Sequence, residues 1–238
     1  MHARKDTHIG AGTGKFLCLT SAIAIALQLA GCGATVVTVD SRLPPPLTVK
    51  QPLGIGLRVP KEFSQYVYKE KRYGSAWQVN LGTAQARALT QLLEAMFEQV
   101  VLLNEVTAAP GDHRVRAVLE PAVDEYSFIT PRDAGSPMYA VSIKYRLNIY
   151  TAAGKLADSW AFTGYGSVPA AGGFDSDEPL KAASELAIRD AGAKLVAEFR
   201  DQPVLRELAQ GRGDEDAGEV EAGPAPDGSP AEPPAKPE

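Results

Sequence analysis

The sequence predicts an α+β domain, built as a small antiparallel sheet with two amphipathic helices packed on one face. Residues 138–150 alternate between apolar and polar side chains, as in a strand with one buried face. Apolar residues recur three and four positions apart over 89–101 and 180–199, which predicts two helices with one apolar stripe each. An antiparallel sheet can bury one face and expose the other, so one such sheet could cover both helices.

The first half of the domain is expected to contain a strand, a polar segment and a helix. Alternation over 53–59 predicts the first strand. Tyrosines mixed with charges over 66–73 indicate a polar excursion or weak strand before 77–79. The helix is expected to begin near Thr83, a suitable N-cap. Its apolar stripe is Leu89, Leu92, Leu93, Met96, Phe97, Val100 and Val101.

The second half is expected to contain strands and a long helix. Alternation from Val115 is shifted in phase by Pro121, which favours a sheet edge or a bulge there. After the strand at 138–150, residues 151–155 predict a hairpin loop. The return strand should bring Leu156, Trp160 and Phe162 near the core. A glycine-rich loop at 167–176 leads to the second helix, which should start at 177–179 and end before Pro203.

Composition divides the chain into four parts. We expect a signal segment at 1–31, a proline-containing tether at 32–51, the α+β domain at 52–208 and a tail at 209–238. Proline residues 44–46 favour an extended spacer that would lift the domain away from its anchor. The tail is acidic, holds six prolines and lacks aromatic residues, so it is expected to be disordered.

A short apolar run near the N-terminus ends in a recognisable motif. Lys15 precedes fifteen uncharged residues, 16–30, too few to span a bilayer as a helix but typical of a secretory signal. The run ends in Leu29, Ala30, Gly31 and Cys32, which resembles the lipobox of bacterial lipoproteins. This resemblance implies that Cys32 is lipidated and becomes the first residue of the mature protein. Gly33 in place of an aspartate favours the outer membrane, with the protein facing the periplasm.

The charge distribution argues against nucleic acid as a partner. The whole chain carries a net charge of −5, and loss of residues 1–31 would make it −7. Most of that charge lies in the tail, which leaves the domain near neutral. Binding to nucleic acid requires clustered Lys and Arg, which the domain lacks.

The chemistry of the mature chain predicts neither an enzyme nor a metal or cofactor site. It keeps one histidine, His113, and one cysteine, Cys32, which is assigned to the lipid. Zinc sites use several such ligands. Glu120, Asp124 and Glu125 could supply the carboxylate pair of a cell-wall hydrolase, but a solvated strand edge is the simpler interpretation.

Three tyrosines form the candidate contact surface. Tyr66, Tyr68 and Tyr73 lie among charged residues rather than on a regular apolar stripe. Tyrosine is enriched at interfaces because its large ring carries a polar tip. Trp77, Trp160 and Phe97 are assigned to the core instead.

Two further resemblances point to the cell envelope. The topology is similar to periplasmic lipoproteins of envelope transport, including the lipopolysaccharide-assembly lipoprotein that plugs its barrel partner. The segment 187–191, with Gly164-Tyr165-Gly166 upstream, is similar to uncharacterised proteobacterial lipoproteins. These resemblances imply a non-enzymatic accessory or scaffold component of an envelope transport or assembly complex, with an envelope protein as partner. The alternatives are a lipid- or glycan-binding module, with a crevice between sheet and helices, or a cell-wall hydrolase.

Overall fold

The computed structural model describes residues 34–108, 114–170 and 177–210 and contains two mixed sheets. In the three-stranded sheet, β4 lies between β1 and β3 and runs parallel to β1. In the five-stranded sheet the order is β5-β2-β6-β7-β8, and β2 runs parallel to both of its neighbours. The strands are β1 (Thr35–Thr38), β2 (Gln51–Arg58), β3 (Val67–Arg72), β4 (Ser75–Asn80), β5 (Phe97–Leu103), β6 (Val115–Ile129), β7 (Met138–Thr151) and β8 (Leu156–Pro169).

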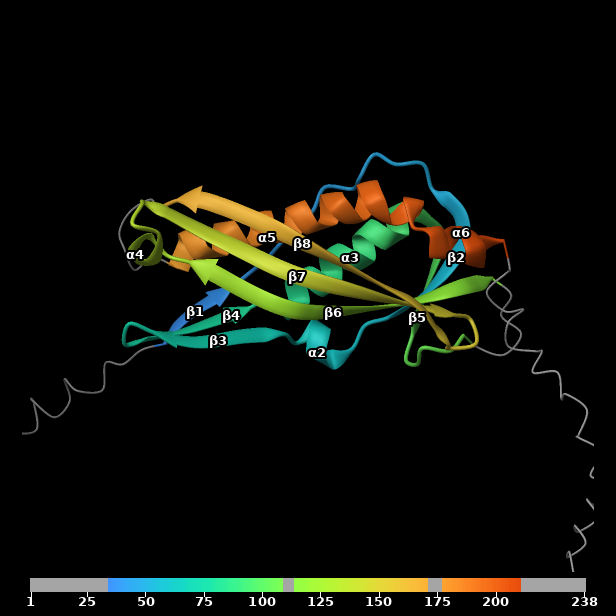
Figure 1. The fold of residues 1–238 in the computed structure, drawn as a ribbon, viewed down its shortest axis with the longest axis horizontal. Helices are drawn as coiled ribbons and strands as arrows, with labels where there is room; N and C mark the ends of the chain where they lie inside the picture. Colours follow the sequence, from blue (N-terminus) through green and yellow to red (C-terminus); the bar gives the residue numbers. More distant parts are fainter. Residues whose placement is uncertain (1–33, 109–113, 171–176, 211–238) are drawn as a thin grey trace, which may run out of the picture.

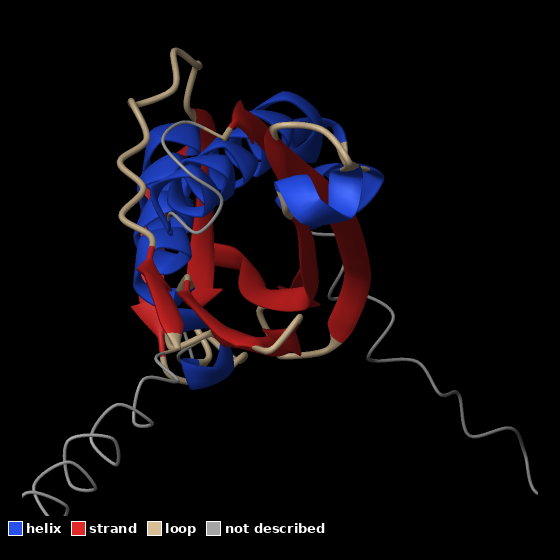
Figure 2. Cartoon of the chain, turned by 90° about the vertical axis from the view of Figure 1, so that its left-hand side faces the viewer, coloured by secondary structure: helices blue, strands red, loops and turns tan. Residues whose placement is uncertain are grey.

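Two long helices, α3 (Gly82–Met96) and α5 (Asp177–Glu198), run along one side of the five-stranded sheet (Figure 1). The strands curve around the interior, and the two long helices lie along one side of it (Figure 2). Helix α5 packs most extensively against β8 and also touches β7, β1 and α3. The shorter helices are α2 (Lys61–Ser64), α4 (Pro131–Ala134), the 3₁₀ helix η2 (Phe199–Asp201) and α6 (Pro203–Ala209).

The α+β class is confirmed, but the single small antiparallel sheet is wrong. Two sheets are present, and β1–β4, β2–β5 and β2–β6 are parallel pairs. Alternation of apolar residues reports which face of a strand is buried and carries no information about strand direction. The prediction was correct where hairpins join the strands, because β6, β7 and β8 pair in antiparallel fashion.

The two strongest sequence patterns are confirmed. In β7 six alternating side chains are buried: Tyr139, Val141, Ile143, Tyr145, Leu147 and Ile149. In α5 and η2 the expected stripe is also buried: Leu180, Ala183, Ala187, Ile188, Ala191, Leu195 and Phe199. Trp77 and Phe97 lie in the core, and Trp160 packs against it between Phe162 and Phe199. Leu156 was expected near the core but is 54% exposed.

The expected first helix is five residues too long. Helix α3 ends at Met96, and Phe97, Val100 and Val101 belong to strand β5. Phe97 and Val101 are four residues apart, a spacing that puts two side chains on one face of a helix and also on one face of a strand. The apolar pattern alone therefore does not show where the helix ends. The β-branched pair at 100–101 favours the strand.

The expected tether contributes to the folded domain. Residues 35–38 form β1, and Val37, Val39 and Ser41 are buried. Prolines 44–46 lie beside Gln91 and Glu94 of α3, within the connection from β1 to β2. The proline segment therefore follows the first strand of the domain instead of preceding the domain.

Pro121 has the position that its sequence context predicts. Strand β2 pairs with β6 only as far as Leu119, so Pro121 lies just beyond the shared stretch. A register shift between Val123 and Glu125 marks a bulge a few residues later. Because proline cannot donate to a ladder, it is accommodated where one side of β6 has lost its neighbour.

Candidate functional site

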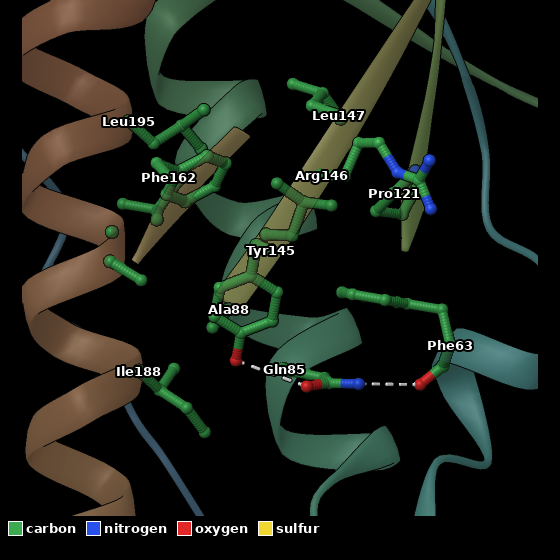
Figure 3. Close-up of a pocket in the computed structure, with 14 residues that line it drawn as sticks. Phe63, Gln85, Ala88, Pro121, Tyr145, Arg146, Leu147, Phe162, Ile188 and Leu195 are labelled. Atoms are coloured by element: carbon green, nitrogen blue, oxygen red, sulfur yellow. Dashed lines mark hydrogen bonds between the residues drawn. The ribbon is translucent and has the colours of Figure 1, made fainter. Parts of the chain in front are cut away.

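A small cavity lies where the sequence predicts a crevice, between the sheet and the helices. It is lined by Gln85, Ala88, Leu89 and Leu92 of α3, Ile188, Ala191, Gly192 and Leu195 of α5, Phe63 of α2, and Pro121, Tyr145, Arg146, Leu147 and Phe162 of the sheet. Figure 3 shows these side chains converging from the helices and the strands. The volume is about 40 Å³ and the lining is mainly apolar.

The polar groups at this cavity are bonded to one another. Gln85 donates its side-chain N–H to the carbonyl oxygen of Phe63 at 2.8 Å, and it accepts a bond from the Tyr145 hydroxyl at 3.2 Å (Figure 3). Burial raises the pKa of Tyr145, so this hydroxyl stays protonated. The pair joins α3 to β7 and to the end of α2. It is a structural contact that leaves little polar capacity for a ligand.

The size of the cavity limits its occupants. One water requires roughly 10–15 Å³ of such volume, so this space holds a few waters at most. A sugar ring or an acyl chain would have to displace α3 or α5 from the sheet. The location matches the expected lipid or glycan crevice, but the shape shown is that of a packing gap in the core.

The three candidate tyrosines occupy different environments. Tyr66 and Tyr68 are half-buried against the core. The ring of Tyr68 lies 4.8 Å from that of Tyr126 and 6.1 Å from that of Phe128, measured between centroids. Burial, together with a hydrogen bond to Glu70, raises the pKa of Tyr68 to about 12. Two of the three tyrosines therefore serve packing.

Tyr73 is the exposed member of the set, at 57%. It sits in the two-residue turn between β3 and β4, with φ of +53°, followed by Gly74 at +83°. Turns with both central residues at positive φ favour Asn, Asp and Gly, and a larger side chain there is strained by roughly 1–2 kcal/mol. An aromatic side chain is thus held at the tip of the hairpin against its backbone preference.

Helix α4 holds the Tyr73 ring from the neighbouring end of the five-stranded sheet. The Tyr73 hydroxyl donates to Asp133 Oδ1 at 2.7 Å, and the Arg132 guanidinium lies 4.0 Å from the ring centroid. A cation over a ring face at this distance is attracted by the ring's quadrupole. Tyr73 and Arg132 together form an exposed aromatic and cationic surface, which we call the hairpin tip.

A network of ion pairs supports the hairpin tip. Arg72 bonds Glu70 through two nitrogens, at 2.9 and 3.0 Å, and Asp133 Oδ2 at 2.8 Å. It also donates to the carbonyl oxygen of Phe128 on β6. Partial burial raises the pKa of Asp133, but hydrogen bonds from the Thr130 backbone, Tyr73, the Thr130 hydroxyl and Arg72 outweigh it, so the net shift is downward. Arg72 thus ties the β3–β4 hairpin to β6 and α4.

The two short segments that resemble proteobacterial lipoproteins meet in the structure. Gly164 and Gly166 of β8 lie under α5, so close that a Cβ on Gly166 would be 2.0 Å from the carbonyl oxygen of Ala183. Asp190 of α5 accepts a bond from the Tyr165 backbone N–H at 2.9 Å, and Lys194 bonds Asp190 and the Thr163 carbonyl. Burial raises the pKa of Asp190, but bonds from Lys194 and the Tyr165 backbone produce a net lowering. This pairing fixes α5 on the sheet and satisfies backbone groups of an edge strand.

Two of the three carboxylates considered for hydrolysis, Glu120 and Asp124, belong to separate ion pairs, and Glu125 is exposed. Glu120 binds Arg58 and accepts a bond from the Tyr150 hydroxyl at 3.3 Å. Asp124 lies at the bulge and binds Arg146 at 2.6 Å. Tyr126, two residues after Asp124, is buried and shares a hydrogen bond with Ser184 of α5. The bulge shifts the alternation, which sequence spacing alone does not reveal.

Several predicted features lie outside the described residues. These are the signal segment with Leu29, Ala30, Gly31 and Cys32, the loop with His113, and the tail beyond residue 210. Over 34–108, 114–170 and 177–210, no group of three or more His, Cys, Asp or Glu side chains is placed to hold a metal. Within the same ranges, no helix has the length and apolar character needed to cross a membrane.

Comparison with known proteins finds similarity at the level of structure. No family model matches the chain, and no curated protein matches its sequence. A DUF330 protein from Xanthomonas campestris is similar with a TM-score of 0.48 at 14% identity, over 74% of this chain and 99% of that protein. A Helicobacter pylori protein described as a "putative neuraminyllactose-binding hemagglutinin homolog" has a TM-score of 0.45 at 12% identity, over 72% of this chain and 100% of that protein.

A third similar structure is described as a "putative lipoprotein" from Caulobacter crescentus. Its TM-score is 0.34 at 12% identity, over 54% of this chain and 83% of that protein. These likenesses are limited to the general arrangement of strands and helices, and they assign no function to this chain.

Proposed function

We propose that the protein is a lipoprotein of the bacterial outer membrane that faces the periplasm and acts, without catalysis, as an accessory or scaffold component of an envelope transport or assembly complex. The observation that carries the proposal is Leu29-Ala30-Gly31-Cys32 at the end of a fifteen-residue uncharged stretch. Small residues before the cysteine allow a processing enzyme to approach the backbone closely. Two or more acyl chains on one cysteine would anchor the protein stably, whereas a single chain binds only marginally.

A scaffold role is supported by polar side chains that connect one element of the domain to another. Three of its ion pairs join separate elements: Arg58 of β2 to Glu120 of β6, Arg72 of β3 to Asp133 of α4, and Arg146 of β7 to Asp124 of β6. The Gln85–Tyr145 pair does the same inside the core. Such groups hold surfaces in a fixed arrangement, which suits a protein that presents a contact surface.

Lipidation is tested on the full chain expressed in a Gram-negative host. Globomycin, which blocks lipoprotein processing, should leave a larger precursor, and Cys32→Ser should prevent processing in the same way. Mass spectrometry of the untreated protein should find acyl chains on Cys32. An unmodified cysteine, or unchanged size and membrane association in both experiments, would contradict the proposal. Ser75→Cys, which changes an exposed residue of the domain, controls for the effect of a substitution alone.

The accessory role is tested by crosslinking in intact envelopes, followed by isolation through a C-terminal tag. One defined envelope protein should be recovered in comparable amount. Recovery of abundant lipoproteins alone would count against an accessory role. Tyr66→Ala and Tyr68→Ala are poor probes here because both rings pack against the core. Tyr73→Ser, which removes an exposed ring, tests whether the protein partner uses the candidate contact surface or another part of the domain.

A second candidate function, a lipid- or glycan-binding module, rests on the location of the apolar cavity between the helices and the sheet, and it requires α3 or α5 to move away from the sheet to admit a ligand. Native mass spectrometry of the delipidated full chain would show an added mass if a ligand is retained. Ala88→Leu, which fills the cavity from α3, should then remove that mass. A clean unliganded mass for the starting protein would exclude a tightly held ligand.

A further inference from the structure

We propose that the hairpin tip, Tyr73 with Arg132, rests on the surface of the lipid bilayer, so that the domain stands on the membrane by this end. The inference depends on the proposed lipidation of Cys32. It goes further by assigning the candidate contact surface to lipid headgroups and by fixing the orientation of the domain.

The length of chain before β1 sets the distance to the anchor. Strand β1 starts at Thr35, three residues after Cys32. Because an extended chain spans at most about 3.6 Å per residue, the two Cα atoms lie within roughly 11 Å of each other. The prolines that were expected to act as a spacer lie after β1 and cannot lengthen this link. The start of β1 must therefore stay close to the bilayer.

The register of the three-stranded sheet places the hairpin tip at the same level. Thr35 of β1 lies opposite Trp77 of β4 in a parallel pair. The turn residues Gly74 and Tyr73 therefore lie three and four residues before the position opposite Thr35, on the side from which the chain enters β1. At about 3.3 Å per residue, the turn extends roughly 10–13 Å beyond Thr35 toward the anchor. Figure 1 shows the start of β1, the β3–β4 turn and α4 at one end of the molecule.

The side chains at this end have the chemistry of a membrane interface. Tyrosine is enriched at the headgroup level of bilayers because its ring is apolar and its hydroxyl is polar. Arginine near an anionic lipid surface contributes roughly 1 kcal/mol of attraction. Three acidic side chains at this end are paired, Glu70 and Asp133 with Arg72, and Glu178 with Lys181 at 3.9 Å, whereas Asp177 is exposed. Tyr73 stays exposed despite its positive φ, as expected if contact outside the domain favours it.

A lipid surface fits this end better than a protein does. A helix with its side chains is about 10–12 Å across. The chain from Cys32 to Thr35 keeps the start of β1 within roughly 11 Å of the lipidated cysteine, a distance no larger than one such helix. Lipid headgroups fill that space without lengthening the link, so an envelope protein partner should bind to the sides or the far end of the domain.

The experiment measures which end of the lipidated full chain lies near lipid. Cys32 is the only cysteine left after processing, and acylation blocks it, so an introduced cysteine can be labelled alone. Ser136→Cys, next to α4, and Ala153→Cys, in the β7–β8 loop, both change exposed residues. Strand β7 has 14 residues, about 45 Å, so these sites are far apart. Each protein carries an environment-sensitive fluorophore and is reconstituted into phosphatidylethanolamine and phosphatidylglycerol vesicles containing headgroup-level nitroxide lipids.

We expect the label at position 136 to be quenched several-fold more strongly than the label at position 153. Tyr73→Ser combined with Arg132→Ser should reduce quenching at position 136 while the protein stays bound to the vesicles. Lys155→Ser, in the far loop, is the matched control and should leave quenching unchanged. Equal quenching at the two labels in bound protein would overturn the orientation alone. Protein that lacks acyl chains on Cys32 and does not bind vesicles would overturn both the orientation and the proposed lipoprotein.

Discussion

The β8–α5 contact and the hairpin tip differ in how tightly they are packed. Along β8, two glycines allow the backbone of α5 to approach so closely that no Cβ fits between them. At the hairpin tip, by contrast, nothing lies within 4 Å of where a Cβ on Gly74 would be, and the Tyr73 ring is exposed, with Asp133 and Arg132 as its contacts. The first region has no freedom to change, whereas the second keeps an exposed aromatic side chain in a strained turn.

The packed β8–α5 contact mainly stabilises the fold, whereas the hairpin tip mainly presents an exposed surface. Close contact between helix and sheet gains dispersion and excludes water, and any added atom must displace backbone. The ion pairs of the hairpin tip are partly exposed, and screening by solvent reduces their contribution to about 0–1 kcal/mol. Substitutions at the tip should therefore affect what the domain touches more than whether it folds.

Gly166→Ala should have the largest effect. Its Cβ would meet the Ala183 carbonyl at 2.0 Å, so α5 must shift, and we expect a loss of about 2–3 kcal/mol in the free energy of unfolding. Gly74→Ala is the matched control: it has space but a φ of +83°, which should cost about 1 kcal/mol. Urea denaturation of the full chain measures both. Equal losses would break the comparison, because backbone conformation rather than close packing would then dominate at both sites.

The packed region is also the part of the fold that the sequence predicts well. The alternation in β7 and the stripe of α5 are repeated over many residues, so a chance match is excluded by length alone. The short loop at 151–155 made the antiparallel pairing of β7 with β8 predictable, since short loops join antiparallel neighbours. Here local pattern and tertiary structure agree.

The hairpin end was predicted less well because its order comes from contacts distant in sequence. Strand β1 pairs with β4 across some forty residues, and no local pattern marks a four-residue strand. The tyrosines at 66–73 were identified as a set, but the sequence does not show that Tyr68 faces Tyr126 while Tyr73 faces solvent. Arg132 was not identified, because it reaches the ring only through the meeting of α4 with the turn.

Tyr145→Phe should have the next largest effect, inside the packed region. It leaves the buried Gln85 oxygen without its bond from the Tyr145 hydroxyl, which should destabilise the domain by about 1–2 kcal/mol. Tyr150→Phe removes a hydroxyl whose bond to Glu120 is only part-buried, and should cost less. Thermal unfolding of both variants tests the ranking. If the two are equal, burial adds nothing to the hydrogen bond, and the contrast between packed and exposed regions weakens.

Asp133→Asn should have a smaller, pH-dependent effect at the hairpin tip. Because the pKa of Asp133 is lowered in the folded state, its contribution is present above the ordinary value of 3.8 and is lost as the pH falls through the folded value. We expect a deficit of about 1 kcal/mol at neutral pH, as for loss of a helix cap. The difference from the unaltered protein should shrink below about pH 4. Asp158→Asn, on the exposed face of β8, is the control, and a deficit that stays constant down to pH 2 would contradict the assignment.

Arg132→Ala should have the smallest effect on folding, although it removes half of the proposed lipid contact. An exposed cation–π contact is worth about 0.5–1 kcal/mol, and the Tyr73 hydroxyl keeps its bond to Asp133 after the change. The free energy of unfolding should therefore fall by no more than that, and Lys155→Ala in the far loop should be near neutral. Urea titrations of the two variants measure the difference. A loss as large as that of Gly166→Ala would mean that the tip belongs to the folding core, and an exposed aromatic turn would then need no partner outside the domain.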